Sequence, residues 1–483
     1  MKKCGVVHWL WLLLCLSLGA SASSWQDEPE ARLQLHQFGL ELALADVHPD
    51  LTLYWQQAVS AGTASDAADD RLLLALTAFW RQWGQLSFEQ RQHLGTARLA
   101  LASTEREREQ LRLAAVAGER HRLVQQLAPG FADYAALRAQ LARLLALADQ
   151  PWPALAGATL RSGERHPAVA RIRERLQLLG DLPAGADSPD PDGYDDTLAE
   201  AVRRFQQRHG LTVDGVIGRQ TYAWLDASPR LRAQLLMRSM LRTLIGDALP
   251  ASYLLVNIPE YRLRLYQDQA MVLESDVIVG KGSRRTPIMH SAITNVVVNP
   301  PWNVPRSITT KDIVPRLYQD PGYLEREQFE VLDGDGRVVP AEEWQDSLQY
   351  NAFPYRLRQR PGSRNALGTY KFHLPNNDAI YLHDTPARGL FSRDSRALSS
   401  GCVRVEGAEQ LAQWLLAGQW SPQRLAELRD TGRTRWLKVD RPLPVFMVYW
   451  RGWLGSDGLP RYRDDIYDFD RQLADPFSPR RGS

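Results

Sequence analysis

The sequence lacks an excess of charge of either sign and, beyond residue 22, a long apolar run. Its 58 Lys and Arg residues nearly balance 56 Asp and Glu residues, for a formal charge of +2 that falls to zero without Lys2 and Lys3. A chain without net charge has no general electrostatic attraction for nucleic acid, so we predict no nucleic-acid partner. At 483 residues it is long enough for about three globular domains.

Residues 1–22 have the composition of a secretory signal peptide. Lys2 and Lys3 form a charged start, an apolar stretch runs to Leu18, and Ala20-Ser21-Ala22 supplies the small residues of a cleavage site. The apolar run is short for a membrane-spanning helix, which favours cleavage near Ala22 over a retained anchor. Either outcome predicts that the rest of the protein is exported.

Cysteine is scarce, with three residues in the whole chain. Cys4 and Cys15 lie in the predicted signal peptide, so Cys402 has no partner for an intramolecular disulfide. Because exported proteins usually pair their cysteines, an unpaired one is either a reactive thiol or a buried bystander. The predicted compartment favours the reactive thiol.

Residues 23–160 are rich in Leu, Ala, Arg and Gln, and they repeat apolar residues three or four positions apart. The pattern is clearest at 71–83 and 134–149 and is typical of amphipathic helices. No motif in this region carries recognisable chemistry. We therefore predict a helical scaffold that serves as a spacer or as a contact for other proteins.

Residues 166–226 contain three short helical segments separated by turns. In the second segment Asp196 or Thr197 is the expected cap and Gly210 the stop. The apolar stripes are Val169, Ile172, Leu176 and Leu179, then Leu198, Ala201, Val202 and Phe205. Together with LTVDGVIGRQTYAWL, these residues resemble the peptidoglycan-binding type 1 domain, which we assign to 161–230. The resemblance implies contact with glycan strands through 166–226, and a three-helix spacer is the alternative.

From Tyr253 onward the apolar period changes to that of strands. YLLVNIPEYRLRLYQ alternates in its second half, and further strand-like runs follow as far as VFMVYW. We predict a multidomain α+β protein whose β-rich, sandwich-like domain occupies 245–440, with a C-terminal strand and tail at 441–483. A polar insertion with little strand patterning, 302–368, is expected to be a lid, and a surface decoration is the alternative.

Two segments match ligand-binding loops only in part. Residues 188–200 carry Asp190, Asp192 and Gly193 at calcium-loop positions, but Ser188 and Ala199 stand where the two terminal ligands are required. GKGSRR at 280–285 lacks the spacing of a phosphate-binding loop. Because no Cys/His spacing suits zinc either, we predict no metal site.

His383 ends a strand-like run, AIYLHD, and a turn follows it. Alternation along a strand places Tyr381 and His383 on one face, which suits the floor of a site, and we assign Tyr381 to substrate binding. The neighbouring Asp384 side chain should point away from that face. We therefore expect a backbone carbonyl, and not Asp384, to orient the imidazole.

Ser399-Ser400-Gly401-Cys402 places a glycine just before the thiol. Glycine lets the backbone approach a substrate carbonyl, so backbone N–H groups around Ser400, Gly401 and Cys402 are candidate oxyanion donors. If the chain after Cys402 is extended, Arg404 shares the thiol's face and can bind a carboxylate. Each residue alone has an ordinary structural explanation, but their joint placement with His383 favours a site.

IYLHDTP…LFSRDSRALSSGCVRVE (380–406) resembles the active-site block of the YkuD-type L,D-transpeptidases, in which a histidine is followed by S-x-G-C-[IV]-R. The order of a leader, a helical region, a binding module and a catalytic domain with an insertion resembles the YcbB-like branch. One position departs from the common pattern, because Ser400 stands where many members carry a second histidine. That departure leaves His383 as the histidine that the motif places near the thiol.

The resemblance implies that Cys402 is the nucleophile and His383 the proton acceptor and donor. Cys402 would attack the carbonyl between the diamino acid and the terminal D-alanine of a tetrapeptide stem. Transfer of the acyl group to the diamino acid of a second stem gives a 3→3 cross-link in periplasmic peptidoglycan, without a cofactor, and implies acylation by carbapenems. The helical region would then contact other wall-synthesis proteins.

Three other functions remain open on the sequence. Water as the acyl acceptor would give an L,D-carboxypeptidase, and a lipoprotein substrate would give an enzyme that anchors a protein to the wall or cuts that link. A non-enzymatic wall-binding scaffold is the third, although an intact His383 and Cys402 argue against it.

Overall fold

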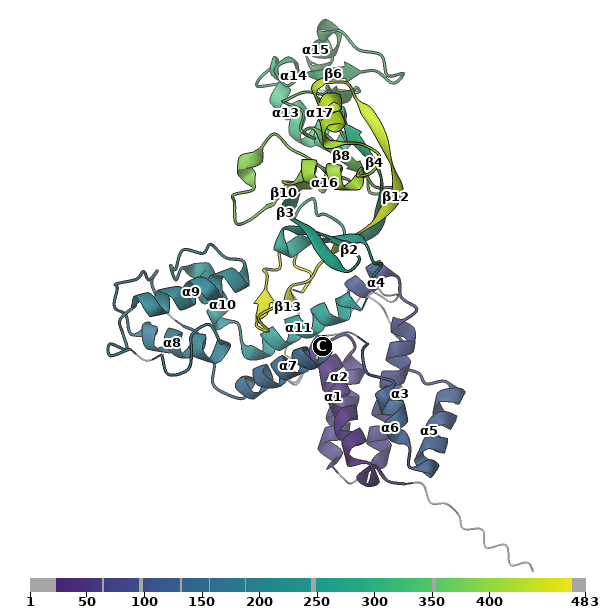
Figure 1. Cartoon of the computed structure of the whole chain (residues 1–483), viewed down its shortest axis with the longest axis vertical. Coiled ribbons are helices and arrows are strands. Elements are labelled where there is room, and N and C mark those ends of the chain that lie inside the picture. Colours follow the sequence, from purple (N-terminus) through teal and green to yellow (C-terminus); the bar gives the residue numbers. More distant parts are fainter. Residues whose placement is uncertain are drawn as a thin grey trace, which may run out of the picture. The chain divides into compact units, whose positions relative to one another are not determined.

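The computed structural model describes residues 23–62, 65–94, 99–130, 133–155, 157–186, 188–244, 249–349 and 353–470 (Figure 1). The predicted signal peptide, with Cys4 and Cys15, lies outside these residues. The chain divides into two compact units. The first comprises Met1–Ala43, His48–Trp83 and Leu99–Pro129, and the second Leu44–Val47, Gly84–Arg98 and Gly130–Ser483. Within the described part of the chain, no helix has the length and apolarity that a membrane span requires.

The first unit is made of helices, as the sequence predicts. Its elements are η1 (Trp25–Asp27), α1 (Pro29–Ala45), α2 (Pro49–Ala61), α3 (Asp66–Trp83), α5 (Glu105–Ala117) and α6 (Arg120–Gln125). The apolar stripe of α3 is buried through Leu72, Leu76 and Phe79. Asp69 on the same helix is also buried, and it is paired with Arg32 and His36. Helical periodicity therefore builds this unit, and the buried charge of Asp69 is compensated by its partners.

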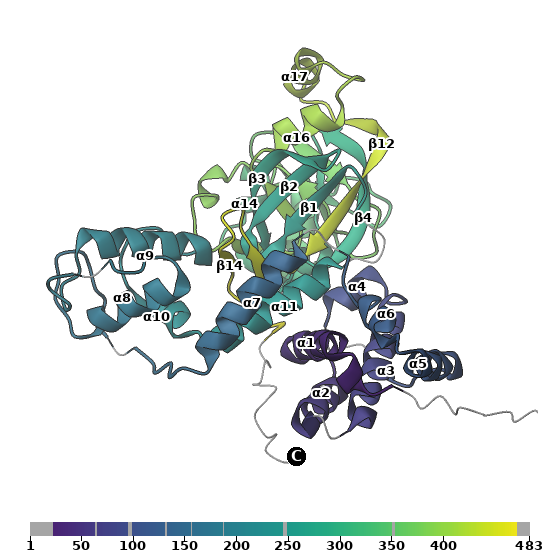
Figure 2. The same ribbon diagram turned by 60° about the horizontal axis from the view of Figure 1, so that its bottom comes forward.

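Six helices of the second unit precede its strands. They are α4 (Phe88–Gln92), α7 (Tyr134–Ala148), α8 (Ala168–Leu179), α9 (Asp196–His209), α10 (Arg219–Asp226) and α11 (Pro229–Thr243). Helices α7 and α11 lie side by side (Figure 2). The predicted scaffold of 23–160 thus contributes α4 and α7 to the unit that contains the sheet.

Helices α8, α9 and α10 form the predicted three-helix module. All eight residues of its two apolar stripes are no more than 5% exposed. Helices α8 and α9 end at Gly180 and Gly210 in the left-handed region, as expected of terminating glycines. The predicted cap is wrong by one residue, because Asp195 and not Asp196 or Thr197 accepts the Leu198 N–H at 2.8 Å.

Nine strands form one sheet in the order β10-β3-β11-β9-β8-β4-β12-β1-β2, and β3 also pairs with β2, so that the sheet closes on itself. They are β1 (Tyr253–Asn257), β2 (Arg262–Gln267), β3 (Ala270–Gly280), β4 (Met289–Val298), β8 (Tyr370–His373), β9 (Leu382–His383), β10 (Ala397–Ser399), β11 (Val403–Val405) and β12 (Arg435–Val448). The alternation of β2 buries Leu263 and Leu265, as predicted. The β-rich domain is therefore confirmed, and β12 continues its sheet past residue 440.

The core of this domain is built from the inward side chains of the closed sheet and from two helices between β11 and β12. It includes Leu254, Leu263, Val296, Phe372 and Leu382. Helices α16 (Ala408–Leu415) and α17 (Pro422–Asp430) add Leu411, Leu415 and Leu425 to it. The short helical turns η3 (Ile258–Glu260) and η5 (Arg388–Leu390) connect strands.

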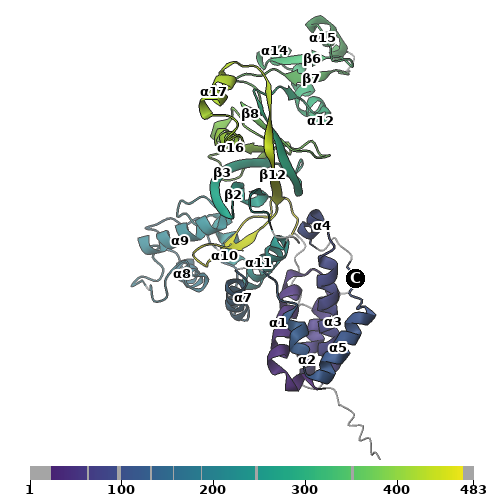
Figure 3. The ribbon, with the colours of Figure 1, turned by 45° about the vertical axis from the view of Figure 1, so that its right-hand side comes forward.

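The insertion between β4 and β8 has a small apolar core of its own, which includes Leu317, Leu324, Val331, Trp344 and Leu357. Its elements are β5 (Trp302–Asn303), α12 (Arg306–Ile308), η4 (Thr309–Ile313), α13 (Val314–Leu317), α14 (Tyr323–Arg326), β6 (Phe329–Leu332), α15 (Ala341–Gln349) and β7 (Arg356–Gln359) (Figure 3). Strands β5, β7 and β6 form a separate sheet. The sequence of the insertion shows little strand patterning because these strands are only two to four residues long.

Residues 449–470, which we call the C-terminal segment, leave β12 and pack against the three-helix module. The segment contains the hairpin of β13 (Gly452–Leu454) and β14 (Pro460–Tyr462). The buried Tyr462 ring stacks on the rings of His209 and Trp224, with centroids 5.6 and 5.7 Å away. The Trp224 indole also donates to Asp464 at 2.8 Å. The module and the β-rich domain are thus joined through this segment.

Candidate active site

Strand register brings three charged or titratable side chains together at the end of β9. His383 pairs with Lys371 of β8 on one side and with Arg404 of β11 on the other. Val403 and Val405 point into the core, so the extended β11 presents Cys402 and Arg404 on the opposite face. His383 is 5% exposed. The sheet therefore fixes the imidazole between two cationic neighbours.

Cys402 stands on a glycine turn between β10 and β11. Gly401 has φ of +121°, and a Cβ at this position would lie 3.3 Å from Cδ1 of Ile380. Only glycine takes up this conformation without strain. The Oγ of Ser399 accepts the Gly401 N–H at 3.1 Å and donates to the Cys402 carbonyl at 2.6 Å. The Gly401 N–H, one of the expected oxyanion donors, is therefore already bonded.

A cleft of 520 Å³ lies over this turn and the end of β9. It is lined by five of the six site residues that the sequence suggests, Cys402, His383, Tyr381, Ser400 and Arg404, whereas Gly401 lies behind it. The insertion supplies the facing wall, including Trp302, Ile308, Ile313, Tyr323 and Phe329. One cavity therefore holds the histidine and the thiol and is bounded by both the sheet and the insertion.

The His383 imidazole is oriented by backbone, as expected. Its Nδ1 donates to the Asp384 carbonyl at 2.5 Å, which leaves Nε2 as the acceptor nitrogen of the neutral ring. The Asp384 carboxylate instead accepts from the Thr369 N–H at 2.9 Å and from Arg388 at 3.1 Å. Asp384 therefore does not complete a Cys-His-Asp arrangement.

Burial and, next, the Arg404 charge lower the pKa of His383 to about 3. The carbonyls of Asp384 and Leu367 raise the pKa of the same ring, but they do not offset burial. A charged imidazole would lose hydration in this position and face a guanidinium. His383 is consequently neutral at physiological pH and able to accept a proton.

The thiol is protonated in this arrangement. Burial raises the pKa of Cys402 above its ordinary value, against hydrogen bonds from Tyr381 and the charges of Lys371 and Arg404. The nearest carbonyl contact of Sγ is Ala379 O, at 3.8 Å. Because both partners are uncharged at rest, the thiolate must be generated by proton transfer when the substrate is attacked.

The structure adds residues that the sequence did not suggest. The Tyr381 hydroxyl hydrogen bonds to Sγ of Cys402 and also interacts with the Trp302 side chain. The Lys371 ammonium lies 4.0 Å from the centroid of the Tyr381 ring. The alternation of YKFH places Lys371 on the face of its strand opposite the buried Tyr370 and Phe372. Only the register of β8 with β9 places that face beside His383. No signal in the sequence pairs Trp302 with Tyr381.

Two of the four cationic residues that line the cleft, Arg404 and Arg284, differ in their partners. The buried Nε of Arg404 has no hydrogen-bond partner among the described residues, and burial lowers the pKa of this guanidinium. Arg284 donates to the Ser400 Oγ at 3.0 Å and forms an ion pair with Asp312 of the insertion. Arg404 is thus left for a ligand, whereas Ser400 is tied to the insertion.

We expect Tyr381→Phe to lower the reactivity of Cys402 at neutral pH by about tenfold, because a hydrogen bond that stabilises the thiolate is lost. The pH dependence of alkylation by iodoacetamide measures this change as a higher thiol pKa. Trp302→Phe, which removes only the outer partner of Tyr381, should have a smaller effect. An unchanged alkylation profile in Tyr381→Phe would show that the hydroxyl does not act on the thiol.

No cluster of three or more His, Cys, Asp or Glu side chains in the described part of the chain is arranged to hold a metal ion. The polar groups of the cleft include a thiol, an imidazole, a phenol, several cations and the carboxylates of Asp312 and Asp378. The thiol and the neutral imidazole in one cleft suit acyl transfer to and from sulfur.

Two segments match known protein families. Residues 251–427 match the YkuD family, described as the L,D-transpeptidase catalytic domain. Residues 165–225 match a family described as "Putative peptidoglycan binding domain". The first match covers the closed sheet and its insertion except for β12, and the second covers the three-helix module.

Curated relatives match part of the chain. A Haemophilus influenzae protein named "Putative L,D-transpeptidase" is 48% identical over 221 residues, which are 45% of this chain and 44% of that protein. The N-acetylmuramoyl-L-alanine amidase CwlM of Mycobacterium tuberculosis is 41% identical over 99 residues, which are 19% of this chain and 24% of that protein. The chain thus spans less than half the length of each of these relatives.

Among solved structures, the L,D-transpeptidase of Xylanimonas cellulosilytica (its residues 123–326) is 17% identical and covers 62% of this chain and 100% of that one, with a TM-score of 0.21. The L,D-transpeptidase of Mycobacterium smegmatis is 12% identical over 41% of this chain and 58% of that one, with a TM-score of 0.19.

Proposed function

Because the chain carries an L,D-transpeptidase catalytic domain and a peptidoglycan-binding domain, we propose that it forms 3→3 cross-links in peptidoglycan through a thioester at Cys402. The observation that carries this proposal is the placement of Cys402 and His383 in one cleft, with the thiol protonated and the imidazole neutral. An acyl-transfer enzyme needs a nucleophile and a base in these states.

In the proposed reaction Sγ of Cys402 attacks the carbonyl carbon of the diamino acid, and Nε2 of His383 takes the Sγ proton. The C–N bond to D-alanine breaks, and the leaving amine takes that proton from Nε2. The amine of a second stem then attacks the thioester and gives its proton to Nε2. The C–S bond breaks, the proton returns to Sγ, and the enzyme is regenerated with one amide bond exchanged for another.

The charge of the cleft supports an anionic substrate. The cleft-lining Arg404 and the nearby Lys371 have no acidic partner among the described residues, and stem peptides carry free carboxylates. We assign Arg404 to one of these carboxylates, which a guanidinium can bind with two hydrogen bonds. Tyr381, which bonds to Sγ and forms the floor of the cleft, contacts the same substrate in this proposal.

The three-helix module, the helical first unit and residues 1–22 are also consistent with a peptidoglycan cross-linking enzyme. The three-helix module would bring the catalytic domain to glycan strands, and the helical first unit would contact other wall-synthesis proteins. The composition of residues 1–22 supports export, and we place the protein in the periplasm. The acylable thiol also makes it a candidate target of carbapenems.

Mass spectrometry of the products formed from a disaccharide-tetrapeptide tests the proposal. We expect a cross-linked dimer together with free D-alanine. A tripeptide product alone would indicate an L,D-carboxypeptidase, and an adduct formed only with an added lipoprotein would indicate an anchoring enzyme. No turnover and no acylation of Cys402 by a β-lactam would leave a wall-binding scaffold.

We also propose that the insertion, 302–368, acts as a lid. Its support is the wall that Trp302, Ile313 and Phe329 contribute to the cleft, together with the contact from Asp312 through Arg284 to Ser400. We expect hydrogen exchange in the insertion to slow when a β-lactam acylates Cys402. Helices α8 to α10 serve as the internal control, and unchanged exchange in the insertion would contradict the proposal.

A further inference from the structure

A chain of hydrogen bonds connects the C-terminal segment to the turn that carries the nucleophile. The Tyr467 hydroxyl accepts the Thr286 N–H at 3.0 Å and donates to the Gly280 carbonyl at 2.6 Å. The Thr286 Oγ1 accepts the Gly280 N–H at 2.8 Å and donates to the Gly401 carbonyl at 2.7 Å. Thr286 is fully buried and Tyr467 is 1% exposed, so neither reaches the substrate.

The contact at the Gly401 carbonyl fixes the peptide that joins Gly401 to Cys402. This peptide is trans, so its carbonyl and its N–H point in opposite directions. The carbonyl is turned toward the buried Thr286, which does not line the cleft, and the Cys402 N–H is therefore turned the other way. No described residue accepts a hydrogen bond from this N–H.

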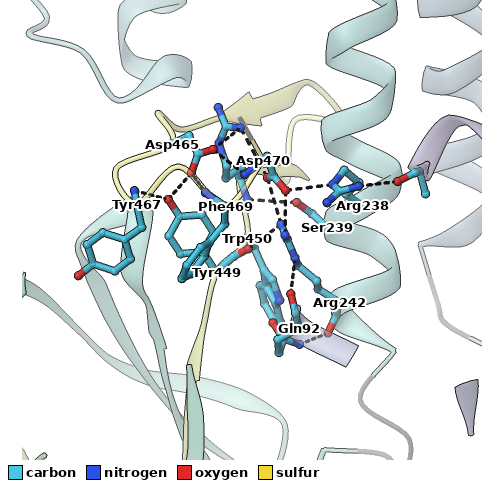
Figure 4. Close-up of polar contacts among 12 residues, drawn as sticks. Gln92, Arg238, Ser239, Arg242, Tyr449, Trp450, Asp465, Tyr467, Phe469 and Asp470 are labelled. Atoms are coloured by element: carbon cyan, nitrogen blue, oxygen red, sulfur yellow. Dashed lines mark hydrogen bonds and ion pairs between the residues drawn. The ribbon is translucent and has the colours of Figure 1, made fainter. Parts of the chain in front are cut away.

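Tyr467 is itself held in place from several sides (Figure 4). Its N–H donates to the Tyr449 hydroxyl at 3.0 Å, and that hydroxyl donates to Asp465 at 2.7 Å. The Arg285 guanidinium lies 5.7 Å from the centroid of the Tyr467 ring. The position of the phenol is thus set by the C-terminal segment and not by the turn that it supports.

The same segment is anchored to α11 by a buried ion-pair network (Figure 4). Asp470 accepts from Arg238 at 3.0 Å and from Arg242 at 2.9 Å, and Arg451 lies 3.5 Å away. Removal of one partner from such a buried network leaves an uncompensated charge and is costly, so these contacts hold the segment against α11. The C-terminal segment, anchored in this way, reaches the nucleophile turn through Tyr467 and Thr286.

We propose that Thr286 and Tyr467 are positioning residues that aim the Cys402 N–H at the substrate carbonyl oxygen, so that this N–H is the oxyanion donor in place of the bonded Gly401 N–H. The proposal rests on acyl transfer at Cys402, the proposed function. The Tyr467 hydroxyl accepts the Thr286 N–H, and the Thr286 hydroxyl donates to the Gly401 carbonyl. The planar peptide then fixes the direction of the Cys402 N–H. A donor held in this way stabilises the oxyanion without reorganisation when it forms.

Two reactions of Cys402 separate this role from a general structural one. Acylation by p-nitrophenyl acetate passes through an oxyanion, whereas alkylation by iodoacetamide does not. We expect Thr286→Val in the full chain to slow acylation by about ten- to a hundredfold and to leave alkylation unchanged. Thr286→Ser, which keeps the hydroxyl, should restore acylation.

Tyr467→Phe removes only the phenolic oxygen and should slow acylation in the same direction as Thr286→Val, also without an effect on alkylation. Tyr370→Phe is the matched control, because Tyr370 is a buried tyrosine whose hydroxyl has no partner among the described residues. Thermal unfolding of every variant, followed by circular dichroism, verifies that the two reactions are compared in folded protein.

Equal acylation of the wild type and both variants would overturn the inference. A parallel loss of acylation and alkylation would also overturn it, because the residues would then only shape the turn. If p-nitrophenyl acetate acylates the wild-type thiol but the protein does not turn over stem peptides, the proposed function fails. The acylation rates of the variants still test the role of the Cys402 N–H in that case.

Discussion

Cys402→Ala is expected to abolish release of D-alanine from tetrapeptide stems, by a factor of at least about 10³, while the protein remains folded. Alanine has no group that can form the thioester, and no other cysteine lies in the described part of the chain. Release of D-alanine, followed by mass spectrometry, measures the loss.

The fold should tolerate this change, since Cys402 is half-buried and forms no disulfide. The conformation of the turn depends on Gly401, Ser399 and Thr286, whose hydrogen bonds involve no side-chain atom of Cys402. Unfolding temperatures of the wild type and the variant should therefore be close. The variant should also no longer be labelled by a β-lactam, and retained turnover would refute the proposed mechanism.

Cys402→Ser is the matched control for chemistry, because it keeps a hydroxyl in the place of the thiol. A hydroxyl is much harder to deprotonate than a thiol, so His383 with its low pKa cannot activate it efficiently. We expect the serine variant to behave like the alanine variant toward stem peptides. Activity close to that of the wild type would mean that a base stronger than His383 acts in the cleft.

The sequence was sufficient to place most of the site together because the chemistry depends on local patterns. The S-x-G-C-[IV]-R motif and the alternation of IYLH put Cys402, His383 and Tyr381 where the structure has them, around one cleft. The expected backbone partner of His383 follows from the same alternation, since the adjacent Asp384 must point elsewhere. Residues within one strand or one turn keep their relations whatever the rest of the fold is.

What the sequence could not predict depends on contacts between distant segments. Lys371 reaches the site through strand register, Trp302 through the path of the insertion, and Tyr467 through the return of the C-terminal segment. The bond between the Gly401 N–H and Ser399 required the actual shape of the turn. The strands of the insertion are too short to show a period in the sequence. In each case the missing information was tertiary.

The pH dependence of acyl transfer is expected to differ from that of an ordinary histidine base. The pKa of His383 is about 3, far below the usual value of 6.5, so the imidazole is already deprotonated throughout the range from about pH 5 to 8. The base is active in its deprotonated form, and activity is lost only as the pH falls toward 3. Between about pH 5 and 8 we expect kcat/KM for stem peptides to be nearly constant.

Replacing His383 with glutamine should lower kcat/KM by roughly 10²- to 10⁴-fold at neutral pH, because general-base assistance is lost. The variant must then react through the small fraction of free thiolate. Since burial raises the pKa of Cys402 above 9.0, that fraction grows about tenfold per pH unit across the neutral range. The variant should therefore show a steep rise of kcat/KM with pH where the wild type is nearly flat.

The comparison of the two profiles decides how the thiol is activated. A flat wild-type profile and a steep variant profile would mean that His383 accepts the proton from a neutral thiol during attack. A fall of kcat/KM in the wild type below about pH 6.5 would instead mean that the imidazole is exposed to solvent in the working enzyme. His383 would then not stay buried between Lys371 and Arg404. Iodoacetamide alkylation over the same range is the control, because it follows the thiolate alone and should rise toward the Cys402 pKa in wild type and variant alike.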